Sequence, residues 1–181
     1  LGLASTRIIG CCAIGGEAVG IAAALCNKYA CDPRELAPHV KELQQLILKE
    51  DGFLPGFKNE DEKDLALKAK ITASSWEQGG EPEKVANGIS RKLGEEQNGW
   101  VTKPGECLIM KWDETKEIRE IRLTFESNFA YPIRVTMAPL RQAQQRNGVP
   151  EELVKDVKIE LYREGKKTGE AFVKDNYQRL C

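Results

Sequence analysis

The chain has 181 residues, of which 41% are hydrophobic and 30% charged, so it can bury one sizeable core or two small ones, and its composition excludes a disordered protein. Its 27 Lys and Arg residues balance 28 Asp and Glu residues, and no basic stripe is interleaved with aromatic side chains, so we expect no nucleic acid as a partner. Because it opens on Leu1 and stops at Cys181 without a polar tail, we expect it to be a piece of a longer protein.

The first predicted element covers residues 8–26, an apolar, Gly- and Ala-rich segment in which Glu17 is the one charged residue. It has three possible interpretations: a membrane or export segment, a buried packing helix, or a helix that contacts a cofactor. A membrane helix needs about 20 mostly apolar residues, and a charge at its centre costs roughly 2.5 to 3.5 kcal/mol. Since Glu17 falls in the middle, we expect no membrane.

Glycines divide this segment. Gly10, Gly15 and Gly16 each cost about 1 kcal/mol in a helix interior, so the sequence predicts a strand or turn over 8–14 and a short helix over about 16–27. A glycine turn that opens a helix directs unpaired backbone N–H groups at anionic or carbonyl oxygens.

Small residues recur on that predicted helix at Gly16, Gly20 and Ala24, one every four positions. One face therefore has almost no side chain, and another backbone or a flat ligand can approach it closely. An Ala-rich packing helix behind a glycine turn remains the alternative.

A second helical region is predicted after Asp32, which can cap a helix with Pro33 at its first position and Glu35 as the capping-box acid. Pro38 starts the main helix and Gly52 ends it. The lone His39 at its start is expected to be solvated.

Turn formers and charges follow from Gly52 to Ala66, as is typical of a connection between domains. We place the boundary near residue 57. The predicted domains are 1–57 and 58–181.

After Ala69 the apolar period changes from 3.6 to 2, which indicates strands. Their alternate residues are polar, so we expect antiparallel sheets with one solvated face and hence a sandwich. The predicted strands are 69–75, 106–112, 118–125, 132–137, 154–162 and 169–174.

Recognition chemistry in this half is sparse. Trp76 follows Ser75 in a loop and can stack on a sugar, whereas Trp100 and Trp112 lie beside strand patterns and are expected in the core. The long insertion 138–152 carries two further weak candidates for ligand binding, Arg141 and Arg146.

The six cysteines include no Cys-x-x-Cys pair and no Cys/His cluster, so we expect free, buried thiols and no metal site. No Ser/His/Asp or Cys/His arrangement and no pair of acids at an interpretable spacing is visible, so the sequence names no catalytic residue.

The stretch STRIIGCCAIGGEAVGIAAAL resembles the C-terminal end of the flavin domain in a family of FAD-dependent oxidoreductases, where an Arg precedes a Thr-Cys-Ala stretch and then Gly-Gln-Ala-Ala-Gly-x-Ala-Ala-Ala. The resemblance implies FAD as cofactor, a small-molecule substrate, and a helix that closes the flavin site. Relatives with iron–sulfur clusters exist, but this chain has no cluster-like cysteine spacing. The residues that the resemblance places at the flavin are Arg7, Gly15, Gly16, Glu17 and Ala18.

Residues 64–181 resemble a galactose-binding-like, or discoidin-like, jelly roll through LALKAKITASS, PEKVANGISR, NGWVTK and CLIMKWDETKEIREIRLTFES, in that order. The same oxidoreductase family includes members with such a module appended. The predicted fold class is thus α+β: a short helical remnant of an FAD-binding α/β domain, then an antiparallel β-sandwich that is incomplete at its C-terminus. The implied function is the C-terminal portion of an oxidoreductase; the alternative is a non-catalytic module that binds carbohydrate or another surface.

Overall fold

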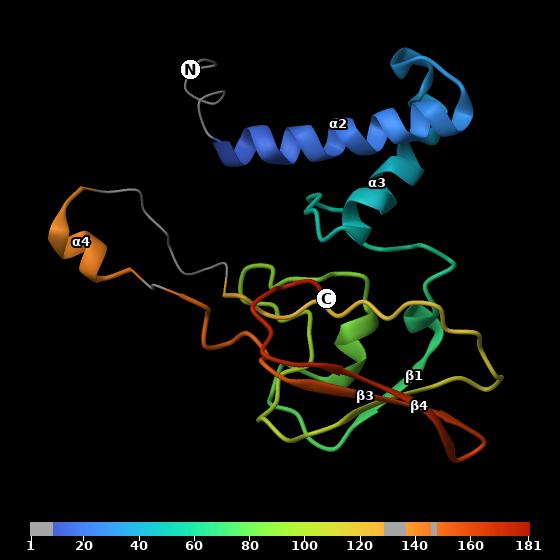
Figure 1. Cartoon of the computed structure of the whole chain (residues 1–181), viewed down its shortest axis with the longest axis vertical. Helices are drawn as coiled ribbons and strands as arrows, with labels where there is room; N and C mark the ends of the chain where they lie inside the picture. The colour runs from blue at the N-terminus through green and yellow to red at the C-terminus, as the bar shows by residue number, and fades with distance from the viewer. Residues whose placement is uncertain (1–8, 129–136, 146–147) are drawn as a thin grey trace. The chain divides into compact units, whose positions relative to one another are not determined.

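The structure is a computed structural model that describes residues 9–128, 137–145 and 148–181 (Figure 1). The chain divides into two compact units, Leu1–Trp112 and Asp113–Cys181, and each is described by itself. The α+β class is confirmed, since a few helices accompany two small antiparallel sheets. The boundary near residue 57 stays a prediction.

Helix α2 (Ile9–Tyr29) opens the first unit as one continuous helix. The predicted strand or turn over 8–14 is therefore wrong for the described residues. No proline interrupts the segment, so the interior backbone N–H and C=O groups can bond within the helix despite its glycines. Glycine lowers helix stability by only about 1 kcal/mol per residue relative to alanine.

Two short 3-10 turns, η1 (Pro33–Glu35) and η2 (Ala37–His39), lead into helix α3 (Val40–Lys49). The predicted acid at Glu35 accepts the backbone N–H of Asp32 at 2.9 Å, so a helical turn does begin where the sequence predicts it. At the end of α3 the left-handed residue is Asp51, with φ of 62°, rather than Gly52.

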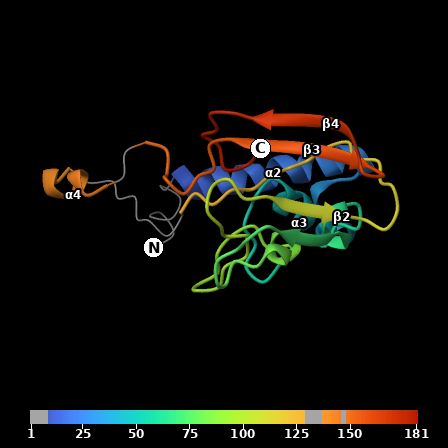
Figure 2. The same cartoon turned by 90° about the horizontal axis from the view of Figure 1, so that it is seen from below.

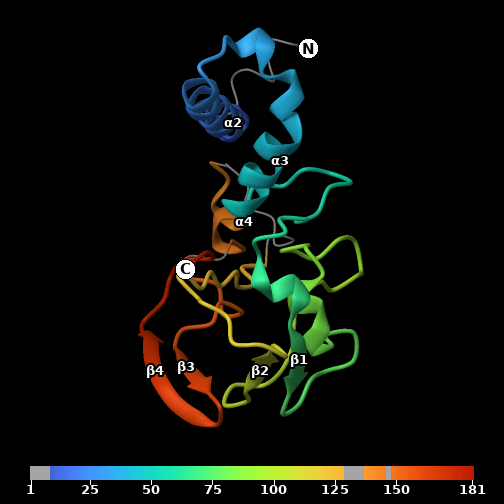
Figure 3. The same cartoon turned by 90° about the vertical axis from the view of Figure 1, so that its right-hand side faces the viewer.

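Strands β1 (Lys70–Ala73) and β2 (Leu108–Lys111) pair antiparallel, with Ile71 opposite Met110 (Figure 3). Both lie inside predicted strands. The 3-10 turn η3 (Leu65–Lys68) precedes β1, and the 3-10 turn η4 (Pro82–Ala86) lies between β1 and β2 in sequence.

The loops of this unit are held by backbone and amide hydrogen bonds. The Val101 N–H donates a hydrogen bond of 3.1 Å to the Gly80 carbonyl. The buried side chain of Asn98 accepts a hydrogen bond from Asn87 Nδ2 at 2.7 Å and donates to the Arg91 carbonyl at 3.2 Å. These bonds satisfy polar groups that burial would otherwise leave unpaired.

In the second unit, β3 (Val157–Arg163) and β4 (Lys166–Val173) form an antiparallel hairpin (Figure 2). Glu164 and Gly165 connect them with φ of 50° and 77°, and two positive φ values in a two-residue loop match the twist of the strands. Helix α4 (Pro139–Ala143) is a single short turn of helix.

The predicted strand 118–125 is wrong as a strand, because only an isolated bridge forms, between Thr124 and Leu180. Leu123 and Cys181 exchange two backbone hydrogen bonds of 2.8 and 2.9 Å, which gives this segment a partner only at its end. Residues 132–136 of another predicted strand lie outside the described residues.

A complete sandwich is absent from the described part of the chain, which contains two separate two-stranded sheets. Its buried hydrophobic residues are few: Leu25, Leu36, Ile71 and Leu153.

Candidate functional site

Helix α2 is exposed at every residue from Gly10 to Glu17, and farther along it is exposed again at Gly20 and Ala24. A Cβ atom built at Gly16 or Gly20 would meet nothing within 4 Å, and both glycines and Ala24 are exposed. At 3.6 residues per turn these residues lie on one side of the helix. The less exposed residues lie on the opposite side: Ala18, Ile21, Ala22 and Leu25.

The end of α2 is tied to α3 by polar contacts. Glu42 accepts hydrogen bonds from Lys28 Nζ at 2.7 Å and from the Tyr29 hydroxyl at 2.6 Å. These bonds hold the pKa of Glu42 below its usual value, and the bond to Glu42 raises the pKa of Lys28. His39, expected to be solvated, is half-buried and stacks on Tyr29 with ring centroids 3.7 Å apart.

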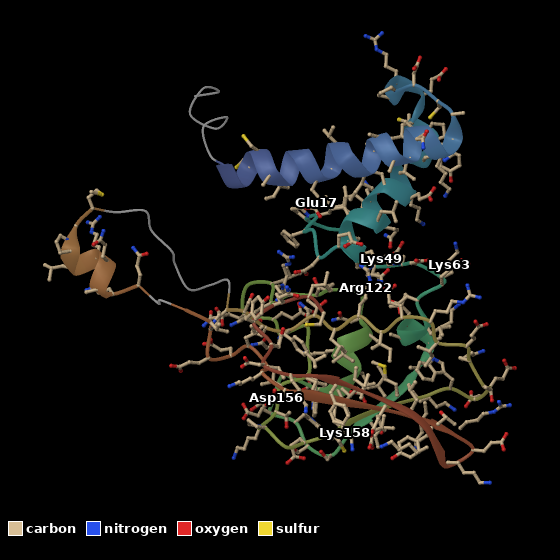
Figure 4. The ribbon with its side chains drawn as sticks, viewed as in Figure 1. Glu17, Lys49, Lys63, Arg122, Asp156 and Lys158 are labelled. Carbon is tan, nitrogen blue, oxygen red and sulfur yellow. The ribbon has the colours of Figure 1, made fainter. Side chains whose placement is uncertain are left out.

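The residues that the resemblance places at the flavin, Gly15 to Ala18, are consecutive in the interior of α2. Their amide groups are used within the helix, so the predicted set of unpaired N–H donors at a helix start is not present at these positions. Glu17 is exposed in the middle of α2 (Figure 4). Arg7 lies outside the described residues.

Among the described residues, α2 is also the helix that is long and apolar enough to cross a membrane, over Gly10–Tyr29, by length and composition only. Buried core helices and signal sequences of other proteins have the same length and apolar composition.

Of the three tryptophans, Trp76 is the exposed one, with 52% of its surface accessible. The indole N–H of Trp100 donates to the Ser75 carbonyl and that of Trp112 to the Leu65 carbonyl, each at 2.8 Å. Both are half-buried, which agrees with the packing role predicted for them. Of the three tryptophans, Trp76 therefore has the side chain that is accessible to a ligand.

The two predicted ligand-binding arginines are Arg141 and Arg146. Arg141 is exposed on α4, and Arg146 lies outside the described residues.

A cluster of charges lies on the β3–β4 hairpin. Glu160 Oε1 is 2.6 Å from Lys158 Nζ and 2.8 Å from Lys167 Nζ, and the Tyr162 hydroxyl donates to the same carboxylate at 3.0 Å. These hydrogen bonds lower the pKa of Glu160 to about 2. Lys167 likewise lowers the pKa of Glu170, which lies opposite Glu160 across the hairpin. All are exposed, as is typical of a solvated ionic surface.

The six cysteines carry free thiols, but none is buried, which corrects the expectation of buried thiols. No group of three or more His, Cys, Asp or Glu side chains that could hold a metal ion occurs in the described ranges. A pair that the sequence analysis missed is Cys26 and Cys31, which line one open depression at the end of α2. The signal that could have revealed it is two cysteines on either side of a helix end.

No family model matches the chain, and neither the curated proteins nor the solved structures offer a match to it.

Proposed function

We propose that this chain is the C-terminal part of an FAD-dependent oxidoreductase and that α2 closes the flavin site of the parent protein. The observation that carries the proposal is the open side of α2 at Gly16, Gly20 and Ala24, where the backbone is accessible. The sequence resemblance over the same helix supports it. Arg7 and Glu17 belong to the proposed contact by resemblance.

FAD would supply the hydride chemistry, and this chain would supply shape. A flat ring can approach the backbone at Gly16 and Gly20 because no Cβ stands in the way. The interior amides of α2 are already hydrogen-bonded, so the fit rests on close approach and not on donated hydrogen bonds.

Replacing Gly20 with leucine tests this function. In the isolated chain the new side chain meets open space and leucine is the better helix former, so we expect the free energy of unfolding to rise by at most about 1 kcal/mol. In the full-length parent we expect flavin retention to fall by about fivefold or more, since overpacking a close contact costs about 1 to 3 kcal/mol. Flavin absorbance of the purified parent measures retention.

Val19→Leu is the matched control, because Val19 already carries a branched side chain and is exposed. It should keep the flavin. A parent that holds flavin equally well with Gly20→Leu would contradict the proposal. Sedimentation of the Gly20→Leu chain with neutral lipid vesicles would instead favour a membrane role for α2, since leucine strengthens insertion.

We propose further that residues 58–181 act as an accessory β-sandwich of the galactose-binding-like type. Four of the six predicted strands form antiparallel pairs in the structure, which supports this assignment. The second candidate function, carbohydrate binding without catalysis, is favoured by the exposed ring of Trp76.

Titration of the chain with a panel of polysaccharides, followed by calorimetry, tests the second function. Trp76→Ala is expected to weaken any binding about two- to twelvefold through the lost stacking alone, because stacking of an aromatic ring contributes about 0.5 to 1.5 kcal/mol beyond the buried area of the ring. Phe57→Ala removes another exposed aromatic ring and is the control. Equal binding by wild type and Trp76→Ala would contradict the role of Trp76.

A further inference from the structure

The end of α2 brings two thiols together through the backbone. The Cys31 N–H donates to the Cys26 carbonyl at 3.0 Å, and the Ala30 N–H donates to the Asn27 carbonyl at 3.3 Å. Ala30 has φ of 49°. This pair of hydrogen bonds around a left-handed residue is the Schellman motif, in which the side chains of the two outer residues approach each other.

The same motif ends α3 and shows how close these outer positions are. The Gly52 N–H donates to the Ile47 carbonyl at 2.9 Å around the left-handed Asp51. A Cβ atom on Gly52 would lie 2.5 Å from Cγ2 of Ile47. Cys26 and Cys31 occupy the equivalent positions on α2.

The two thiols are neighbours. Cys26 and Cys31 are both half-buried, and both line one open depression at the end of α2. Partial burial, and after it the neighbouring Cys26 thiol, raise the pKa of Cys31. A disulfide needs Cα atoms within roughly 4.4 to 6.8 Å. Two residues joined by a backbone hydrogen bond at the outer positions of a Schellman motif are close enough to meet this need without a large backbone movement.

We propose that Cys26 and Cys31 form a reversible dithiol–disulfide site that reacts with low-molecular-weight disulfides such as oxidised glutathione. One protein thiolate attacks a glutathione sulfur, the glutathione S–S bond breaks, and one glutathione thiolate leaves. The second protein thiolate then attacks the protein sulfur of the mixed disulfide and releases the other glutathione. Two protein thiols are oxidised by two electrons, one glutathione disulfide is reduced to two thiols, and the two protons pass to glutathione.

The test treats the reduced full chain with oxidised glutathione, blocks the remaining thiols, and digests it with trypsin. Cleavage after Lys28 separates the two cysteines, so their disulfide is seen as two linked peptides in mass spectrometry. A Cys11→Ser, Cys12→Ser background removes the other thiols from the first peptide. We expect Cys26 and Cys31 to be found linked, and Cys107 to carry glutathione as a mixed disulfide.

Single variants sharpen the result. In Cys26→Ser we expect glutathione to accumulate on Cys31 at least about tenfold above the wild type, because the resolving thiol, with an effective concentration of millimolar or more, is missing. Glutathione on Cys31 of the wild type at the level seen on Cys107 would overturn the proposal.

Ala30 tests the backbone origin of the pairing. Ala30→Gly suits a positive φ and should keep the linked peptides, whereas the β-branched side chain of Ala30→Val disfavours that conformation and should reduce them several-fold. An equal yield of linked peptides in the two Ala30 variants would show that the backbone conformation at Ala30 does not bring the two cysteines together. No step of the test requires flavin, so its failure is distinct from a failure of the proposed oxidoreductase function.

Discussion

Replacement of Gly88 by alanine is expected to lower the free energy of unfolding of the unit Leu1–Trp112 by about 2 to 4 kcal/mol. Gly88 has φ of 87°, a conformation that costs an L-residue about 1 to 2 kcal/mol. An added Cβ would also lie 2.6 Å from the backbone oxygen of Asn59, and the Asn59 N–H donates to the Gly88 carbonyl at 2.8 Å. The backbone would have to move and weaken that bond.

Urea unfolding followed by tryptophan fluorescence measures this loss, because all three tryptophans belong to the same unit. Gly79→Ala is the matched control. Gly79 has φ of 86°, but its added Cβ would meet nothing within 4 Å. The Gly79→Ala variant should therefore lose only about 1 to 2 kcal/mol, from the backbone conformation alone. Equal losses in the two variants would show that the contact with Asn59 has no energetic effect.

Leu25→Ala is expected to weaken the packing of α2 by about 2 to 4 kcal/mol, since large-to-small changes at buried leucines remove contacts and leave a cavity. Leu25 is 3% exposed and lies on the side of α2 opposite Gly16 and Gly20. Amide hydrogen exchange along α2 measures the change as a loss of protection.

Val19→Ala provides the comparison on the same helix, because Val19 is 69% exposed. Its effect on exchange should stay within about 0.5 kcal/mol, as is usual for surface positions. A similar loss of protection in both variants would mean that α2 is held by its own helical bonds and not by Leu25.

Local sequence signals predicted elements well where capping or alternation was strong. Glu35 marks the turn before α3, and the alternating residues of β1 to β4 mark their strands. The segment 118–125 alternates as clearly, yet its ladder depends on a distant partner, and only Cys181 and its neighbours reach it. The alternation of apolar residues can predict a single strand, but it does not show which other segment will pair with that strand in a sheet.

The predicted strand or turn at the start of α2 is wrong because the glycine penalties are smaller than the gain from helical hydrogen bonding. An apolar segment without proline gains more from continuous backbone bonding than it loses at Gly10, Gly15 and Gly16. The thiol pair was missed because the left-handed residue between its members is Ala30, and the usual glycine signal for such a helix end is absent.

Each of the two sheets has only two strands, so every described strand has an outer edge that does not pair within its sheet. Unpaired edges invite edge-to-edge aggregation between copies of a chain. On the β3–β4 hairpin the charges of Lys158, Glu160, Lys167 and Glu170 oppose such contacts, because another strand would have to desolvate them. The ionic cluster thus opposes edge-to-edge contacts of a hairpin that pairs with no third strand among the described residues.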